Sequence, residues 1–363
     1  MPSILPVHPQ PLPGELFSSW VHRVARANGQ NVFSLCYLLA PEMKNTYYNC
    51  DYLVDEGIVF KFAKVLRASR EKAYRTTLES FAGYLFEQAT PKAHIKTCIL
   101  QTGIKRYDDV RFNLQFCPAC LSEGCSYFRK KWRISWLTVC TEHACQLHDR
   151  CPECNFPVRP LKNDVGQPYK MPFLGKITEC FQCGFELKDS TAKRANLEVL
   201  SDACWYEEAL DLGYISLTER TWIYSFSLFS VLRHLIYLIG SGSSKGGNPD
   251  TMPHEFRYNA MRELRGVFRD WPNRLIELCN RRGIKYYHFT NMTKRKPLLP
   301  YWLDAAIRPR MYKPKLGPTK ESVAAAIAYL RTHEIRTSLL QVNRILGYRD
   351  SGLIKKFYKE IHE

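Results

Sequence analysis

The sequence predicts a mainly α protein with a central zinc-ribbon or zinc-finger module and a basic, helical carboxyl-terminal domain. Three observations carry this prediction. Apolar residues recur at helical spacing before residue 112 and after residue 195, paired cysteine and histidine residues crowd between them, and positive charge accumulates toward the carboxyl end. The 363 residues exceed what one ordinary hydrophobic core organises, so we expect several domains.

The expected domain boundaries follow these changes in composition. We predict an amino-terminal helical domain with a helix-turn-helix-like pattern (1–112), a tandem zinc-binding module (113–190), a helical segment (191–240), a Gly/Ser linker (241–250) and a basic helical domain (251–363).

The amino-terminal domain begins with an extended, proline-rich stretch and continues in helices. Residues 15–28 place Leu16, Trp20 and Val24 on one face, and Gly29 ends the helix. Further helices are expected over 32–39, 55–67 and 70–86. A helix, a short turn and a second helix are typical of DNA-binding helix-turn-helix motifs, but most such pairs only pack together.

The strongest local signal is a set of four ligand pairs, each with a two-residue gap. They are Cys117-Pro-Ala-Cys120, Cys140-Thr-Glu-His143, Cys151-Pro-Glu-Cys154 and Cys180-Phe-Gln-Cys183. Such a gap lets two side chains reach one metal ion from a tight turn, and two turns complete a tetrahedron. Taken in order, the pairs predict two zinc sites. Interleaved pairing, disulfides and His148 as a reserve ligand are the alternatives.

Four protein ligands fill each predicted site, so we expect structural rather than catalytic zinc. The remaining cysteines lack paired spacing and are expected to be core or incidental thiols. They are Cys36, Cys50, Cys98, Cys125, Cys145, Cys204 and Cys279.

A basic segment separates the first two ligand pairs. Arg129, Lys130, Lys131 and Arg133 alternate with aromatic residues there, a pattern that suits phosphate contact with base stacking. The alternative is that Trp132 packs on the zinc module while the charged ends reach solvent.

The carboxyl-terminal domain holds most of the excess positive charge. Residues 251–363 carry 23 basic and 10 acidic side chains, whereas residues 1–250 carry 29 and 25. This asymmetry indicates an anionic polymer, such as DNA, as a partner; a basic surface kept for solubility is the alternative.

Helices are expected over 255–269 and 274–282, and three short ones over 321–332, 338–346 and 351–361. The last three fit a helix-turn-helix that turns at Gly347. Three groups of basic residues are the candidate DNA contacts. They are Lys294, Arg295 and Lys296; Arg308, Arg310, Lys313 and Lys315; and Arg349, Lys355, Lys356 and Lys359. A solvated loop and a helical bundle that docks on a partner protein are the alternatives.

Several signals are absent from the sequence. There is no G-x-x-x-x-G-K-[ST], G-x-S-x-G or H-E-x-x-H motif, so we expect a non-enzyme whose partner hydrolyses ATP. The first residues lack a basic and an apolar region, so no signal peptide is expected. The apolar stretch 222–239 contains Arg233 and His234, which favours a buried helix over a membrane span.

These residues resemble the TniQ/TnsD family of transposon target-selection proteins. The matching features run from Cys117-Pro-Ala-Cys120-Leu121 through Tyr127-Phe-Arg129 and Trp132-Arg133 to Cys140-Thr-Glu-His143 and Cys151-Pro-Glu-Cys154. Residues 15–29 also look like the family's opening helix, so the resemblance covers about residues 5–190.

The resemblance implies a role in a heteromeric cut-and-paste transposition machine. Such proteins mark the insertion site and hand it to a AAA+ ATPase (TnsC-like), which recruits the transposase. TnsD-like members read DNA themselves, whereas other TniQ proteins ride on a CRISPR effector complex with guide RNA, often as dimers. The length of this chain favours the second class, as an adaptor in the bacterial cytoplasm at the nucleoid. The alternatives are a TnsD-like sequence-specific DNA-binding protein and a nuclease or transposase subunit.

Overall fold

The computed structural model describes most of the chain and confirms the mainly helical prediction. The described residues are 5–45, 50–53, 55–87, 96–101, 112, 114–159, 161, 175–240, 248–290, 299–312, 317–348 and 352–362. Their contacts form two compact units, Met1–Arg310 and Met311–Glu363.

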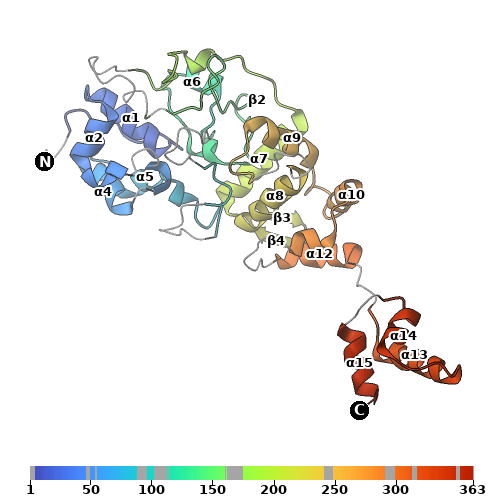
Figure 1. Cartoon of the computed structure of the whole chain (residues 1–363). Coiled ribbons are helices and arrows are strands. Elements are labelled where there is room, and N and C mark those ends of the chain that lie inside the picture. The colour runs from blue at the N-terminus through green and yellow to red at the C-terminus, as the bar shows by residue number, and fades with distance from the viewer. Residues whose placement is uncertain are drawn as a thin grey trace. The chain divides into compact units, whose positions relative to one another are not determined.

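The amino-terminal helices pack around a shared apolar core. Figure 1 shows the longer ones in blue, and the elements are α1 (Phe17–Ala27), α2 (Val32–Leu39), η1 (Pro41–Asn45), α3 (Cys50–Leu53), α4 (Glu56–Val65), α5 (Arg70–Tyr74) and η3 (Leu78–Phe81). Phe17 lies edge-on to both Trp20 and Phe62, and all three side chains are fully buried. The expected helix over 70–86 is shorter than predicted. It ends where the Thr76 hydroxyl donates to the carbonyl of Ala73, a local bond that competes with helix continuation.

The central segment contains little regular structure. Its described elements are α6 (Pro118–Ser122), η4 (Lys130–Arg133), the two-residue strands β1 (Val139–Cys140) and β2 (Cys145–Gln146), and η6 (Leu187–Asp189). β1 pairs with β2 in antiparallel register, with Cys140 opposite Cys145. The side chains of Trp132, within η4, and Trp136 are buried. Most of this segment therefore depends on side-chain contacts rather than on backbone ladders.

A helical layer follows, interrupted by a hairpin. It comprises α7 (Leu197–Leu212), β3 (Tyr214–Thr218), β4 (Thr221–Tyr224), α8 (Ser225–Gly240), α9 (His254–Leu264), α10 (Asn273–Arg282), α11 (Tyr286–Thr290) and α12 (Tyr301–Met311). Figure 1 shows α7 and α8 beside the hairpin. Among the described helices, none is long and apolar enough to cross a membrane.

The β3–β4 hairpin lies where continuous helical patterning was predicted. Gly213 ends α7 in the left-handed region, with φ 81°. Beyond it, side chains alternate between the two faces: Ile215 and Ile223 are buried, whereas Trp222 and Tyr224 are 64% and 68% exposed. A period of two is incompatible with a helix, but it covers only two short strands between the longer helices α7 and α8.

The first compact unit continues past the Gly/Ser linker expected over 241–250 and ends at Arg310. Arg257 of α9 is fully buried and donates to the carbonyl of Ser135 at 2.7 Å and to Oε1 of Gln115 at 3.1 Å. On α8, Arg233 forms an ion pair with buried Asp250. The contacts of Arg257 tie α9 to the central segment.

The second unit is a small three-helix bundle. It consists of α13 (Lys320–Thr332), α14 (Leu339–Ile345) and α15 (Gly352–His362). Its core is built from Val323, Ile327, Val342 and Ile354. A capping box fixes the start of α13, since the Thr319 hydroxyl accepts from the backbone N–H of Ser322 at 3.1 Å.

Candidate metal centres and basic residues

The first group of potential metal ligands is assembled from α6, β1 and the turn after β1. Cys117 caps the amino end of α6 and Cys120 lies in its first turn, while Cys140 ends β1. Nδ1 of His143 lies 3.2, 3.6 and 3.7 Å from the sulfurs of Cys120, Cys140 and Cys117. All four donor atoms lie within 4.8 Å of one another. These separations suit four ligands around one ion with bonds of about 2.0–2.3 Å.

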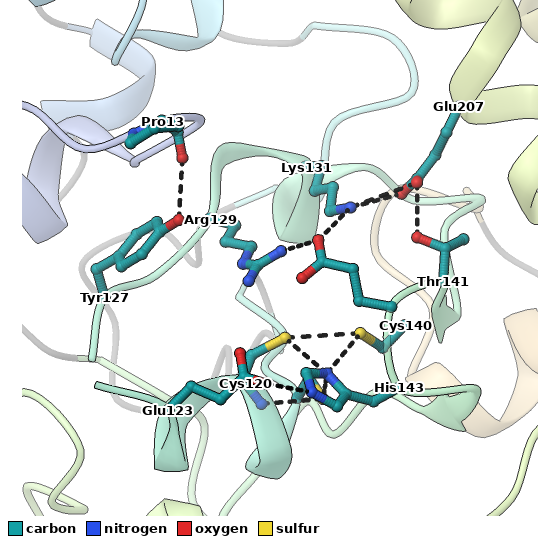
Figure 2. A network of polar contacts seen from close by, with 12 residues as sticks. Pro13, Cys120, Glu123, Tyr127, Arg129, Lys131, Cys140, Thr141, His143 and Glu207 are labelled. Carbon is teal, nitrogen blue, oxygen red and sulfur yellow. Dashed lines mark hydrogen bonds and ion pairs between the residues drawn. The ribbon is translucent and has the colours of Figure 1, made fainter. Parts of the chain in front are cut away.

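The imidazole of His143 is also held from its other side. Its Nε2 lies 2.7 Å from Oε1 of Glu123, as Figure 2 shows. A carboxylate at this position fixes the ring orientation and leaves Nδ1 directed at the sulfurs, which is the common second contact of a metal-binding histidine.

The second group consists of two equivalent turns. Cys151 and Cys183 have their sulfurs 3.7 Å apart, and those of Cys154 and Cys180 are 3.6 Å apart. In each turn a backbone N–H donates back to the first cysteine's carbonyl, from Asn155 at 3.0 Å and from Gly184 at 2.8 Å. Both donors have positive φ, 63° and 77°. The four sulfurs lie within 4.8 Å of one another.

The two groups can therefore each hold a metal ion, and they combine the ligand pairs in sequence order. Interleaved pairing is not what the structure has, and His148 belongs to neither group, since its ring stacks on Phe116 at 5.2 Å. Cys36, Cys50, Cys98 and Cys279 are buried thiols, whereas Cys125 and Cys204 are exposed.

Cys145 is a residue that the sequence analysis missed. Its sulfur lies 3.5 Å from that of Cys117, although we had assigned it to the incidental thiols. The signal was available in the short segment from Cys140 to Cys145, because a tight hairpin places its two ends opposite each other. Without knowledge of the β1–β2 pairing, that signal did not stand out beside the two-residue gaps.

The two centres differ in how much protein surrounds them. Cys117 is fully buried, whereas Cys183 is exposed. We expect Cys117→Ala to increase proteolytic cleavage over much of residues 114–159, whereas Cys183→Ala increases it only near 151–187. Limited proteolysis with fragment mapping measures this, with exposed Cys204→Ala as the control. Equal cleavage patterns in the two variants would contradict the expectation.

The basic segment 129–133 is occupied by contacts within the chain. Arg129 forms an ion pair with Glu142, and Lys131 forms ion pairs with Glu142 at 3.5 Å and Glu207 at 3.1 Å. The hydroxyl of Thr141 donates to Glu207 at 2.7 Å. Figure 2 shows this network extending from the first ligand group to α7.

The other two basic residues of the segment lie deeper. Nζ of Lys130 donates to the carbonyl of Arg75 at 2.8 Å. Burial, aided by the charge of Arg75, lowers the pKa of Lys130 to about 8. Arg133 is 1% exposed and contacts Asp51 at 3.1 Å and the carbonyl of Leu100 at 3.0 Å. The position of Arg133 does not fit the predicted phosphate contact, because its guanidinium belongs to the protein core. Trp132 is buried, as the packing alternative expected.

The later basic residues have different surroundings. Arg308 pairs with Asp304 at 2.9 Å, and Arg310 donates to Oδ1 of Asn273 at 2.8 Å. Lys355, Lys356 and Lys359 are exposed on α15. The remaining candidates, Lys294, Arg295, Lys296, Lys313, Lys315 and Arg349, lie outside the described residues.

Comparison with known protein families gives a match in the amino-terminal part of the chain. The TniQ family model matches residues 6–147, a range that includes the amino-terminal helices and the whole of the first ligand group. The search of curated proteins gave no match. The TniQ domain is associated with target-site selection by transposons. Over residues 6–147 the chain is thus similar to the TniQ family.

Proposed function

We propose that this protein is a non-catalytic adaptor that selects the target site of a heteromeric cut-and-paste transposon. The similarity to the TniQ family over residues 6–147 is the observation that carries the proposal. In this role the chain connects recognition of target DNA to a AAA+ regulator ATPase of the TnsC type. A CRISPR effector complex with guide RNA supplies the sequence information, and the protein acts in the bacterial cytoplasm at the nucleoid.

We further propose that each ligand group holds one structural zinc ion. The first offers three thiolates and an imidazole, and the second offers four thiolates, the donor sets that zinc favours. Zinc bound there supplies folding energy. Glu123 then fixes the orientation of His143. The ion pairs of Lys131 with Glu142 and Glu207 connect the turn after β1 with α7.

DNA contact is best supported in the carboxyl-terminal bundle. Lys355 and Lys356 extend from exposed positions of α15, whereas Ile354 faces the bundle core. Exposed lysines on one helix of a three-helix bundle are typical of phosphate contact at a helix-turn-helix. This observation also favours the second candidate function, a TnsD-like protein that reads its attachment site directly.

The two candidates are distinguished by selecting a random duplex pool on the purified, zinc-loaded protein at about 150 mM salt, where non-specific binding is weak. The adaptor gives only salt-sensitive binding without an enriched motif. A TnsD-like protein enriches one motif and protects it in a footprint. Divalent-metal-dependent cleavage of the pool would contradict both candidates.

Charge reversal at the two α15 lysines tests the proposed DNA contact directly. Replacing Lys355 and Lys356 by glutamate weakens duplex binding by about tenfold and lowers the salt dependence of log K by about 2, because two phosphate contacts are lost. Fluorescence anisotropy over a salt series measures both quantities. The same reversals at Lys64 and Lys72, exposed on α4 and α5, are the matched control. Equal losses in the two double variants would remove α15 from the proposal.

A further inference from the structure

A fifth potential donor lies beside the four members of the first ligand group. Cys117, Cys120, Cys140 and His143 already supply four. The sulfur of Cys145 lies 3.5 Å from that of Cys117. This separation matches the 3.6 Å between Cys120 and Cys140 in the same group, and it exceeds the length of a disulfide bond by more than 1 Å. Cys145 therefore presents an unbonded sulfur at ligand spacing from Cys117, beside the group of four donors.

The backbone fixes Cys145 in this place. Cys145 pairs with Cys140 across the β1–β2 hairpin, and its side chain is buried, with 4% of the residue exposed. The flanking hydrogen bond from the N–H of Leu147 to the carbonyl of Thr138, at 3.0 Å, continues the same pairing. The two side chains of a cross-strand pair lie on the same face, so the sulfurs of Cys140 and Cys145 are on the same side of the β1–β2 hairpin.

His143 is the ligand with the most access to solvent. It lies in the turn between the two strands, its side chain is 23% exposed, and its partner Glu123 is 60% exposed. Imidazole is also the one neutral donor of the five, because the other four are sulfurs that bind metal as anionic thiolates. A soft divalent ion favours thiolate over imidazole when both are within reach.

We propose that Cys145 is a fifth ligand of the first centre, which takes the fourth coordination position when His143 leaves it. The centre thereby has two alternative ligand sets, three sulfurs with one nitrogen and four sulfurs, around the same thiophilic divalent ion. The exchange breaks the metal bond to Nδ1 of His143 and forms a bond to Sγ of Cys145, whose proton passes to solvent. The inference rests on the proposal that this centre binds zinc.

Cobalt(II) is the probe that separates the two sets, because four-sulfur coordination absorbs at longer wavelength than coordination by three sulfurs and one nitrogen. The full-length protein is loaded with cobalt as wild type, His143→Ala, His143→Ala/Cys145→Ser and the control His143→Ala/Cys204→Ser. Bound metal is counted, and the absorption of each protein is recorded.

We expect two ions per chain in the wild type, in His143→Ala and in the Cys204 control, and one ion in the Cys145 double variant. The His143→Ala spectrum shifts to longer wavelength. Loss of one ion from His143→Ala alone, or an unshifted spectrum, would overturn the inference and leave Cys145 as a neighbour that only contacts the Cys117 sulfur. A wild type that binds fewer than two ions would instead contradict the underlying metal proposal.

Discussion

Removal of metal by a chelator is expected to unfold residues 113–190. The described part of this segment has two-residue strands and short helical turns, so its folding energy comes largely from the ligand groups. Structural zinc contributes about 10 kcal/mol or more of apparent binding energy at each such site. A loss of this size is comparable to the whole stability of an ordinary domain, about 5–15 kcal/mol.

Far-UV circular dichroism and protease resistance, measured before and after chelation, test this expectation. Readdition of zinc restores both signals, and chelator saturated with zinc beforehand is the control. Because the metal ligands lie in this segment and β1 contacts α7, cleavage should begin in the metal-binding segment and then extend to α7. Unchanged dichroism and protease resistance after verified metal removal would show that the two zinc sites are not structural.

Replacement of Arg257 by alanine is expected to destabilise the first unit by about 3–5 kcal/mol. The guanidinium donates to the carbonyls of Met252 and Ser135 and to Gln115, at 2.9, 2.7 and 3.1 Å. Burial lowers its pKa to about 10, so the charge is retained at neutral pH. Its removal leaves three buried acceptors without this donor, and it opens a cavity.

Urea denaturation followed by tryptophan fluorescence measures the change in the free energy of unfolding. Arg262→Ala is the matched control, since Arg262 lies exposed on the same helix α9 and its loss should change stability by no more than about 0.5 kcal/mol. Equal effects of the two substitutions would mean that α9 contributes helix propensity alone, and not the hydrogen bonds that join it to the central segment.

The parts predicted well from sequence depend on short-range signals. Each ligand pair is recognisable because a two-residue gap imposes its own geometry, and Asn31, Asp55 and Ser69 cap the following helices with their side chains. The helices over 32–39 and 274–282 begin and end within a residue of the expected positions.

The parts predicted poorly depend on partners far along the chain. Arg133 is directed into the core by Asp51, 82 residues earlier, and Lys131 meets Glu207, 76 residues later. No local pattern indicates either contact, so the sequence of this aromatic and basic segment is equally compatible with a nucleic-acid-binding surface and with packing inside the protein. The contact between α9 and the central segment is equally distant in sequence, because Arg257 and Ser135 are 122 residues apart.

The β3–β4 hairpin has a spectroscopic consequence. Trp222 is the tryptophan of the described chain that is exposed, at 64%, whereas Trp20, Trp132 and Trp136 are enclosed. A collisional quencher in solution therefore reaches the indole of Trp222 far more often than the buried ones. The intrinsic fluorescence of the protein thus contains a component, from Trp222, that reports on this hairpin. Protection of that component from the quencher would reveal binding of a macromolecule to the hairpin without any added label.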